Sequence, residues 1–161
     1  SGSDVEEKMR IDSAGAITKP LQPAFQARPS SKLTDISINT AVNLNFATEI
    51  FDRNADYNAG GSPSAFTAPV TGVYQFNLTA YIENLDTASS YFQIAIITSN
   101  RNYSLVIDPN FSSDLGYYHM TTSVLADMDA SDTAYIQAYQ SGGTAQTDIA
   151  TASTFSGYLV A

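Results

Sequence analysis

The sequence contains no cysteine, and this absence excludes several kinds of chemistry at once. Neither a disulfide, nor a thiolate nucleophile, nor a cysteine metal site can form. A chain of 161 residues is long enough to bury a core of its own. The fold must therefore be held together by packing or by oligomerisation rather than by covalent cross-links.

Charge is also scarce, and most of it has one sign. Asp, Glu, Lys and Arg make up 14% of the residues, against roughly 25% in an average soluble domain. Acidic residues outnumber basic ones by 16 to 7, which gives a formal net charge of −9. Nucleic acid and anionic membranes would repel such a chain, so neither is expected as a partner. A surface that is polar through Ser, Thr, Asn and Gln suits a virion or another extracellular surface.

Long hydrophobic runs and signatures of catalysis are missing as well. No apolar run approaches the roughly 18 residues of a transmembrane helix, so no membrane insertion is expected. The chain shows no nucleophile elbow, no glycine-rich phosphate loop and no histidine-rich metal spacing. We therefore predict a non-enzymatic protein with no catalytic residues.

A few acidic residues are candidates for a catalytic site. Glycoside hydrolysis needs two carboxylates, and Asp127 and Asp129 lie two residues apart, while Asp114 lies near the single histidine, His119. With Asp132, however, the first two fall where a hairpin turn is expected, which favours a solvated turn. No metal site and no cofactor are predicted. Calcium remains an alternative, because loop aspartates are hard oxygen ligands.

Alternating apolar residues predict strands over most of the chain beyond residue 21. Residues 74–82 alternate strictly between apolar and polar or aromatic side chains, as in a half-buried strand. Further strands are expected at residues 91–98, 117–125 and 133–140, separated by turn-rich segments at 84–90, 108–116 and 141–148. Residues 44–51 fit a strand and also a helical face. The pattern as a whole predicts an all-β sandwich.

Three motifs carry a resemblance to a known family. They are Ala-Phe-Gln-Ala-Arg at residues 24–28, Phe-Thr-Ala-Pro-Val-Thr-Gly-Val-Tyr-Gln-Phe at 66–76 and Ser-Thr-Phe-Ser-Gly-Tyr-Leu at 153–159. Together they resemble the globular head of complement component one-q, whose antiparallel jelly roll is shared with tumour necrosis factor. The resemblance covers residues 21–161 and implies a homotrimer. One departure is Ser131, because the family usually has glycine before an aspartate at this turn.

Residues 1–20 are expected to lie outside this domain. Residues 1–3 have the composition of a cloning remnant. Residues 7–20 read as two short strands about a Ser-Ala-Gly turn, which cannot bury anything alone but become sensible if three copies intertwine. The phrase Met-Arg-Ile-Asp-Ser-x-Gly resembles the shaft end of bacteriophage tail fibres. A disordered linker is the alternative.

These features together predict the trimeric head of a phage fibre or virion appendage, located at the virion's distal tip. Its partners would be the other two subunits, the fibre shaft of the same chain and a host-surface receptor. The alternatives are a purely structural trimerisation cap and a secreted recognition domain of the complement one-q or tumour-necrosis-factor type. Four aromatic residues are candidates for the trimer interface, although ordinary core positions would explain each of them: Tyr74, Tyr135, Phe155 and Tyr158.

The receptor is expected to bind at the pole farthest from the shaft. In a jelly roll whose first and last strands end at one pole, the connection at residues 141–149 lies at the other. Amides, hydroxyls and aromatic rings suit sugars or polar peptide surfaces. The candidates are Gln140, Thr144, Gln146 and Asp148, with Asn102 and Tyr103 from a neighbouring turn. A glycine-rich loop without a binding task is the alternative.

Overall fold

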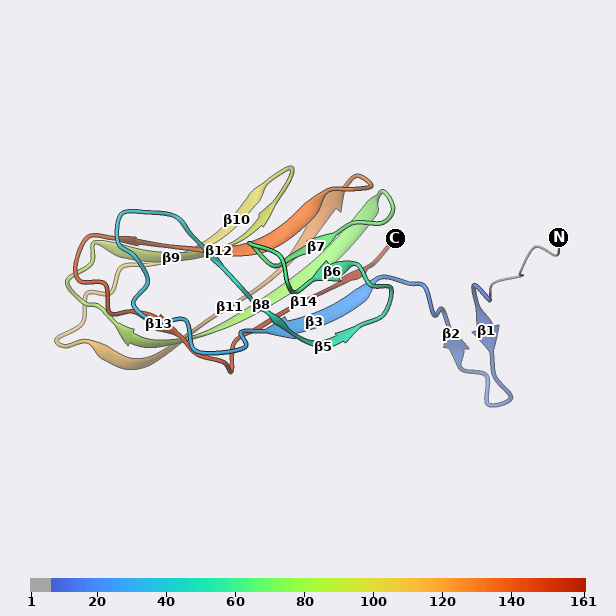
Figure 1. Ribbon diagram of the computed structural model, residues 1–161, viewed down its shortest axis with the longest axis horizontal. Coiled ribbons are helices and arrows are strands. Elements are labelled where there is room, and N and C mark those ends of the chain that lie inside the picture. Colours follow the sequence, from blue (N-terminus) through green and yellow to red (C-terminus); the bar gives the residue numbers. More distant parts are fainter. Residues whose placement is uncertain (1–6) are drawn as a thin grey trace.

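Antiparallel strands make up the regular structure that the computed structural model assigns within residues 7–161, which are the residues it describes. Most strands build a two-sheet sandwich, and a small hairpin stands apart from it (Figure 1). The strands are β1 (Arg10–Ile11), β2 (Ile17–Thr18), β3 (Ala24–Arg28), β4 (Val42–Leu44), β5 (Thr48–Asp52), β6 (Tyr57–Asn58), β7 (Ala65–Thr67), β8 (Gly72–Leu85), β9 (Tyr91–Thr98), β10 (Asn102–Ile107), β11 (Leu115–Met128), β12 (Thr133–Ser141), β13 (Asp148–Ile149) and β14 (Thr154–Leu159).

The two sheets of the sandwich have different strand orders. The first, here called the β8 sheet, runs β11-β8-β14-β3-β5, and β13 also pairs with β8. The second, the β9 sheet, runs β10-β9-β12-β7-β6, and β4 also pairs with β12. The predicted all-β sandwich is confirmed. Leu44 ends β4, residues 48–51 lie in β5 and residues 45–47 connect the two strands, so the helical alternative is wrong.

The core lies between the sheets and consists largely of stacked aromatic rings. The ring of Phe25 stacks on Phe66 at 5.1 Å between centroids and meets Phe155 edge-on at 5.0 Å. Buried tyrosine hydroxyls have partners, because Tyr57 donates to the Phe46 carbonyl at 3.0 Å and Tyr74 to the Val70 carbonyl at 2.7 Å. Burial raises the pKa of Tyr57 to about 12, so this hydroxyl stays neutral at physiological pH.

Gly157 allows the aromatic core to pack directly against the backbone of β14. A Cβ atom at this position would lie 2.5 Å from Cδ1 of Phe76 and 2.9 Å from Cε1 of Phe25. Both rings are fully buried among other aromatic side chains, so neither can move aside. The glycine of the 153–159 motif is therefore required by ring packing rather than by a turn.

Chain entry and chain exit meet at one pole of the sandwich, here called the base. The Gln22 side chain donates to the Leu159 carbonyl at 3.0 Å, and the Leu159 amide donates to the Pro23 carbonyl at 3.1 Å. The connection at residues 141–149 lies at the other pole, here called the distal pole (Figure 1). Among residues 7–161, no helix is long and apolar enough to span a bilayer.

The structure tests two local predictions, one about a turn and one about a strand. The turn before β12 forms in spite of Ser131, whose φ of 80° is one that glycine adopts more readily, and the Asp132 amide closes it by donating to the Asp129 carbonyl at 3.0 Å. The region around Asn102 is an edge strand, β10, rather than a turn. The cloning remnant predicted at residues 1–3 lies outside the described residues.

Candidate functional site

The distal loop, residues 141–147, is held from beneath by a buried amide. Gln140 lies one residue before the end of β12 and has no exposed surface. Its side-chain nitrogen donates to the carbonyls of Gly142 at 3.1 Å and Thr144 at 2.8 Å, while its oxygen accepts from the Thr147 hydroxyl at 2.6 Å. One side chain thus binds two backbone carbonyls of the loop and a hydroxyl at its end, because buried polar groups need partners.

A buried carboxylate fixes the middle of the same loop. Asp86 is 3% exposed and accepts hydrogen bonds from the Thr144 amide and, at 2.8 Å, from the Ala88 amide. Gly142 and Gly143 have φ values of 70° and 75°, and a Cβ on Gly143 would collide with the Asp86 carboxylate. The two glycines therefore let the loop wrap closely around this carboxylate.

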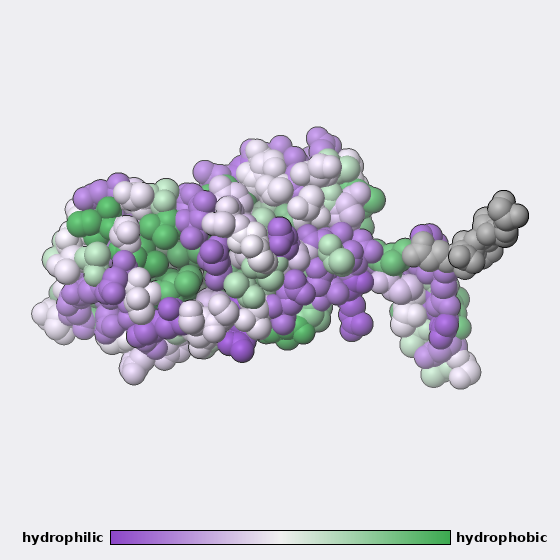
Figure 2. Space-filling model, in the orientation of Figure 1, coloured by the Kyte–Doolittle hydropathy of each residue, from purple (hydrophilic) through white to green (hydrophobic). Residues whose placement is uncertain are grey.

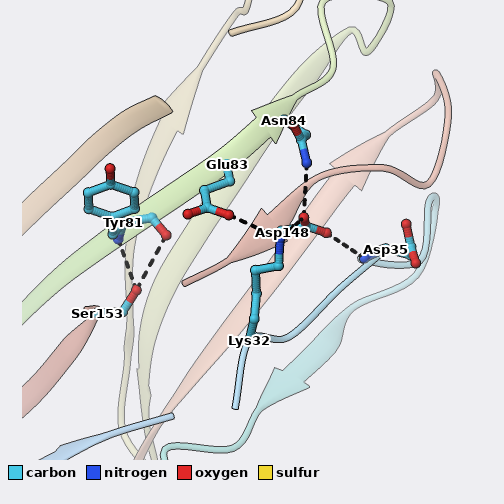
Figure 3. Close-up of polar contacts among 7 residues, drawn as sticks. All are labelled: Lys32, Asp35, Tyr81, Glu83, Asn84, Asp148 and Ser153. Carbon is cyan, nitrogen blue, oxygen red and sulfur yellow. Dashed lines mark hydrogen bonds and ion pairs between the residues drawn. The ribbon is translucent and has the colours of Figure 1, made fainter. Parts of the chain in front are cut away.

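A second buried carboxylate, Asp148, joins two other segments at the distal pole, the connection after β3 and the end of β8 (Figure 3). Asp148 is 4% exposed. It pairs with the Lys32 ammonium at 2.9 Å and accepts from the Asn84 amide at 3.0 Å and from the Asp35 backbone N–H at 2.9 Å. Burial alone would raise the pKa of Asp148, but these hydrogen bonds outweigh it and hold the pKa below its ordinary range.

We expect Asp148→Asn to lower the free energy of unfolding by about 1–3 kcal/mol at pH 7, because the amide cannot accept from all three donors. The folded-state pKa of Asp148 is depressed, so its stabilisation is present above the ordinary carboxyl pKa of 3.8 and is lost as pH falls through the lowered value. Urea unfolding at pH 7 and in acid should show the difference between the two proteins shrinking in acid. Asp127→Asn, on an exposed carboxylate, is the matched control; equal effects at both positions would contradict this role for Asp148.

Between these supports lies an open polar pocket of about 320 Å³. The Asp114 carboxylate connects two loops on the rim of the pocket. It accepts hydrogen bonds from the backbone N–H of Thr87 at 2.9 Å and from the Thr87 hydroxyl at 2.7 Å. It also accepts from the side-chain amide of Gln146 at 2.7 Å. These hydrogen bonds, led by that of the Thr87 backbone, lower the pKa of Asp114. The lining residues are Asp35, Asn84, Asp114, Leu115, Gly116, Gln146 and Asp148. Such a surface offers acceptors and amides to a ligand rich in hydroxyl groups.

The structure divides the predicted receptor residues into three groups. Thr144 and Gln146 lie on the distal loop, Thr144 exposed and Gln146 partly so, and their receptor role stays a prediction. Gln140 and Asp148 lie at the same pole but are buried. Gln140 binds the distal loop from beneath, which corrects its predicted role as a contact residue. Asp148 lines the polar pocket, but its carboxylate is already bound to Lys32.

Asn102 and Tyr103 lie at the wrong end of the molecule for a distal site. Asn102 pairs with Ile97, the β9 residue that lies beside the start of β12. The distal end of β12 instead lies beside Tyr91, at the other end of β9. The predicted grouping of Asn102 and Tyr103 with the distal loop is therefore wrong. Sequence analysis missed Asn84 and Asp35, and it weighed Asp114 only as a carboxylate near His119. Asn84 and Asp114 belong to the turn-rich segments that were predicted.

The outer face of the β8 sheet carries apolar side chains that no other part of residues 7–161 covers. Tyr117 is 70% exposed and Leu125 is 61% exposed, both on β11, and Tyr158 on β14 is 43% exposed. The ring of Tyr81 on β8 lies edge-on to His119 at 4.3 Å and to Tyr117 at 5.8 Å. This surface is here called the β8 face. His119 lies within it, against aromatic rings.

Only one of the four predicted trimer-interface residues lies on the β8 face. Tyr74 and Phe155 have no exposed surface and belong to the subunit's own core, so their predicted interface role is wrong. Tyr135 lies on β12 of the other sheet, partly buried and facing away from the core. Tyr158 remains a candidate. Within residues 7–161, no group of three or more histidine or acidic side chains is placed to bind a metal ion.

Comparison with known proteins agrees with this geometry. The family model of the C1q domain matches residues 24–160. No curated protein matches the chain significantly.

Solved structures share the fold at low sequence identity. The globular domain of zebrafish complement 1qA protein has a TM-score of 0.61 at 20% identity, covering 87% of this chain and 98% of that one. PRD1 vertex protein P5 has a TM-score of 0.61 at 8% identity, covering 99% and 86%. Murine APRIL at pH 8.5 has a TM-score of 0.59 at 8% identity, covering 86% and 99%. With a family match over residues 24–160 and a jelly-roll sandwich to support it, the chain belongs to the C1q domain family, whose members are non-enzymatic binding modules.

Proposed function

We propose that this chain is the homotrimeric head of a phage fibre or virion appendage, which binds a host-surface receptor at its distal pole and closes the end of the fibre trimer. The observation that carries the proposal is that the two ends of the sandwich differ. Chain entry and exit are hydrogen-bonded together at the base, and the loops that contribute polar groups lie at the other end (Figure 1). A head mounted by its base presents the distal loop first.

Trimerisation is supported by the family and by the surface. Domains of the C1q and tumour-necrosis-factor type usually form homotrimers. The exposed Tyr117, Leu125 and Tyr158 give the β8 face an apolar character that a threefold contact would bury, because apolar side chains are stabilised by removal from water.

The virion setting is supported by two observations of different kinds. A phage PRD1 vertex protein shares the fold over nearly the whole chain, at an identity that supports the fold alone. The chain also carries a hairpin before the domain in place of any collagen-like repeat among residues 1–20. A location on the virion surface follows from this proposal.

The backbone of the distal loop is held in a fixed conformation, which suits recognition of a ligand. Asp86 and Gln140 fix its backbone from below, so the exposed groups at residues 144–146 are held in one arrangement before a ligand arrives. Preorganisation of this kind lowers the entropy lost on binding. Acceptor-rich lining and a net charge of −9 favour a neutral or amino sugar, or a polar peptide, over an anionic glycan.

We expect Thr144→Ala/Gln146→Ala to reduce adsorption of the labelled head to host cells on the order of tenfold, while trimer mass and melting temperature stay unchanged. Asn102→Ala/Ser104→Ala makes a matched pair of truncations on β10, away from the distal pole, and should adsorb normally. Periodate treatment of the cells separates a sugar receptor from a protease-sensitive one. Normal adsorption of the loop variant, with loss in the β10 variant, would place the receptor site on the side of the head.

A further inference from the structure

The hairpin formed by β1 and β2 projects from the base as a well-defined unit. Its turn is closed by Asp12, whose carboxylate accepts from the amides of Ala14 and Ala16 at 2.9 Å each. The Asp12 carbonyl accepts from the Gly15 amide at 3.0 Å, and Gly15 has a φ of 84°, which is the geometry of a three-residue hairpin loop. The turn predicted within residues 7–20 is thus present, between the paired strands β1 and β2.

The two faces of the hairpin differ in chemistry. Ile11 and Ile17 pair directly across the strands and therefore lie on the same face, together with Met9 two residues earlier. On the opposite face lie Thr18 and Arg10, which is paired with Glu7 at 2.7 Å. The hairpin has one apolar face and one polar face.

Within residues 7–161, the apolar face is left exposed. Met9, Ile11 and Ile17 are 55%, 62% and 61% exposed. Figure 2 shows the hairpin standing clear of the body with hydrophobic side chains on its surface. A two-stranded hairpin of this size is at best marginally stable in water, so it requires a partner for this face.

The base of the sandwich also carries exposed apolar side chains. Between hairpin and body lies a groove whose body side includes Leu21, Val70 and Val160, which are 36%, 47% and 48% exposed, while Lys8 and Lys19 line it from the hairpin. Val160 follows Tyr158 of the β8 face two residues along the chain. Exposed apolar side chains therefore extend from the β8 face onto the base, next to the chain entry that carries the hairpin.

We infer that the hairpin is an assembly element whose occupant is the same hairpin of two further copies of this chain. The inference rests on the proposed trimer, because a threefold contact through the β8 face gathers the three copies of β14. The Leu159 amide is bonded to the Pro23 carbonyl, so three chain entries are gathered with them. Three hairpins held at such a high local concentration bury Met9, Ile11 and Ile17 against one another.

The absence of native cysteine allows a direct test on the full chain. Single variants Ile11→Cys and Thr18→Cys place a thiol on the apolar or the polar face of the same hairpin. After treatment with a short bis-maleimide, we expect covalent dimers from Ile11→Cys and not from Thr18→Cys. Dimers from neither variant, or equally from both, would overturn the inference. The absence of dimers is also the result expected if the hairpin folds back onto the groove of its own subunit.

A second measurement separates this inference from the proposed function. Ile11→Ser/Ile17→Ser should raise the concentration at which trimers dissociate on the order of tenfold or more, whereas Arg10→Ser/Thr18→Ser should leave it unchanged. A trimer that dissociates identically in both variants refutes the hairpin inference and leaves the trimeric head intact. A wild-type chain that is monomeric refutes both, and normal assembly without host adsorption refutes only the receptor role.

Discussion

The Tyr117→Asp/Leu125→Asp variant should be a folded monomer. Both residues lie on the outer face of β11 with more than half of their surface exposed, so the single subunit does not depend on them. In a trimer through the β8 face, each copy would bring two carboxylates into a contact that excludes water. Burying unpaired charges costs several kcal/mol, more than the contact gains from the remaining apolar area.

Light scattering at micromolar concentration measures this directly. The mass should fall from three times 17.2 kDa to 17.2 kDa, while the circular dichroism spectrum stays that of the wild type. Ala41→Asp adds the same charge at an exposed position beside the β9 sheet and should leave the trimer intact. A double variant that stays trimeric would move the subunit contact to another surface.

Alanine in place of Gly157 should destabilise the domain by about 1–3 kcal/mol, the usual cost of overpacking a well-packed core. The added methyl group would lie 2.5 Å from Cδ1 and 2.7 Å from Cε1 of Phe76. That ring is enclosed by Phe25, Phe66 and Tyr74, all fully buried, so relief requires displacing β14 itself.

The matched control is Gly116→Ala, in β11 of the same sheet, where no atom lies within 4 Å of the added Cβ. Its midpoint in urea should stay the same or rise slightly, because glycine in a strand carries an entropic cost. If Gly157→Ala unfolds at the wild-type midpoint, the aromatic packing against β14 has been misassigned.

Strand positions were predictable because burial here follows alternation closely. Phe76, Leu78, Ala80 and Ile82 point inward along β8 exactly two residues apart, and the side chains between them face outward. The same alternation places Tyr74 inward, so the sequence already contained the reason that Tyr74 is core. Alternation also places Tyr117 and Leu125 on one face of β11, which was the available signal for the β8 face.

The candidate site was less predictable, for two physical reasons. Polar residues beside a loop are usually exposed, but Gln140 is buried because the loop's carbonyls need partners below it, and Asp148 is buried where it binds Lys32 and the Asp35 backbone N–H. Strand pairing, moreover, cannot be inferred from the local sequence. The register of Asn102 with Ile97 decides which pole it occupies, and only the three-dimensional structure shows that pairing.

The way the chain enters the sandwich determines how the head carries load. Leu21 leads into β3, which runs from the base toward the distal pole between β14 and β5. Antiparallel ladder bonds lie perpendicular to the strands. If the proposed function holds, a pull on the residues before β3, with the distal loop held by a cell, would be directed along β3 and would strain its hydrogen bonds to both neighbours together instead of opening them one at a time. Such a shear geometry would make the proposed head mechanically resistant.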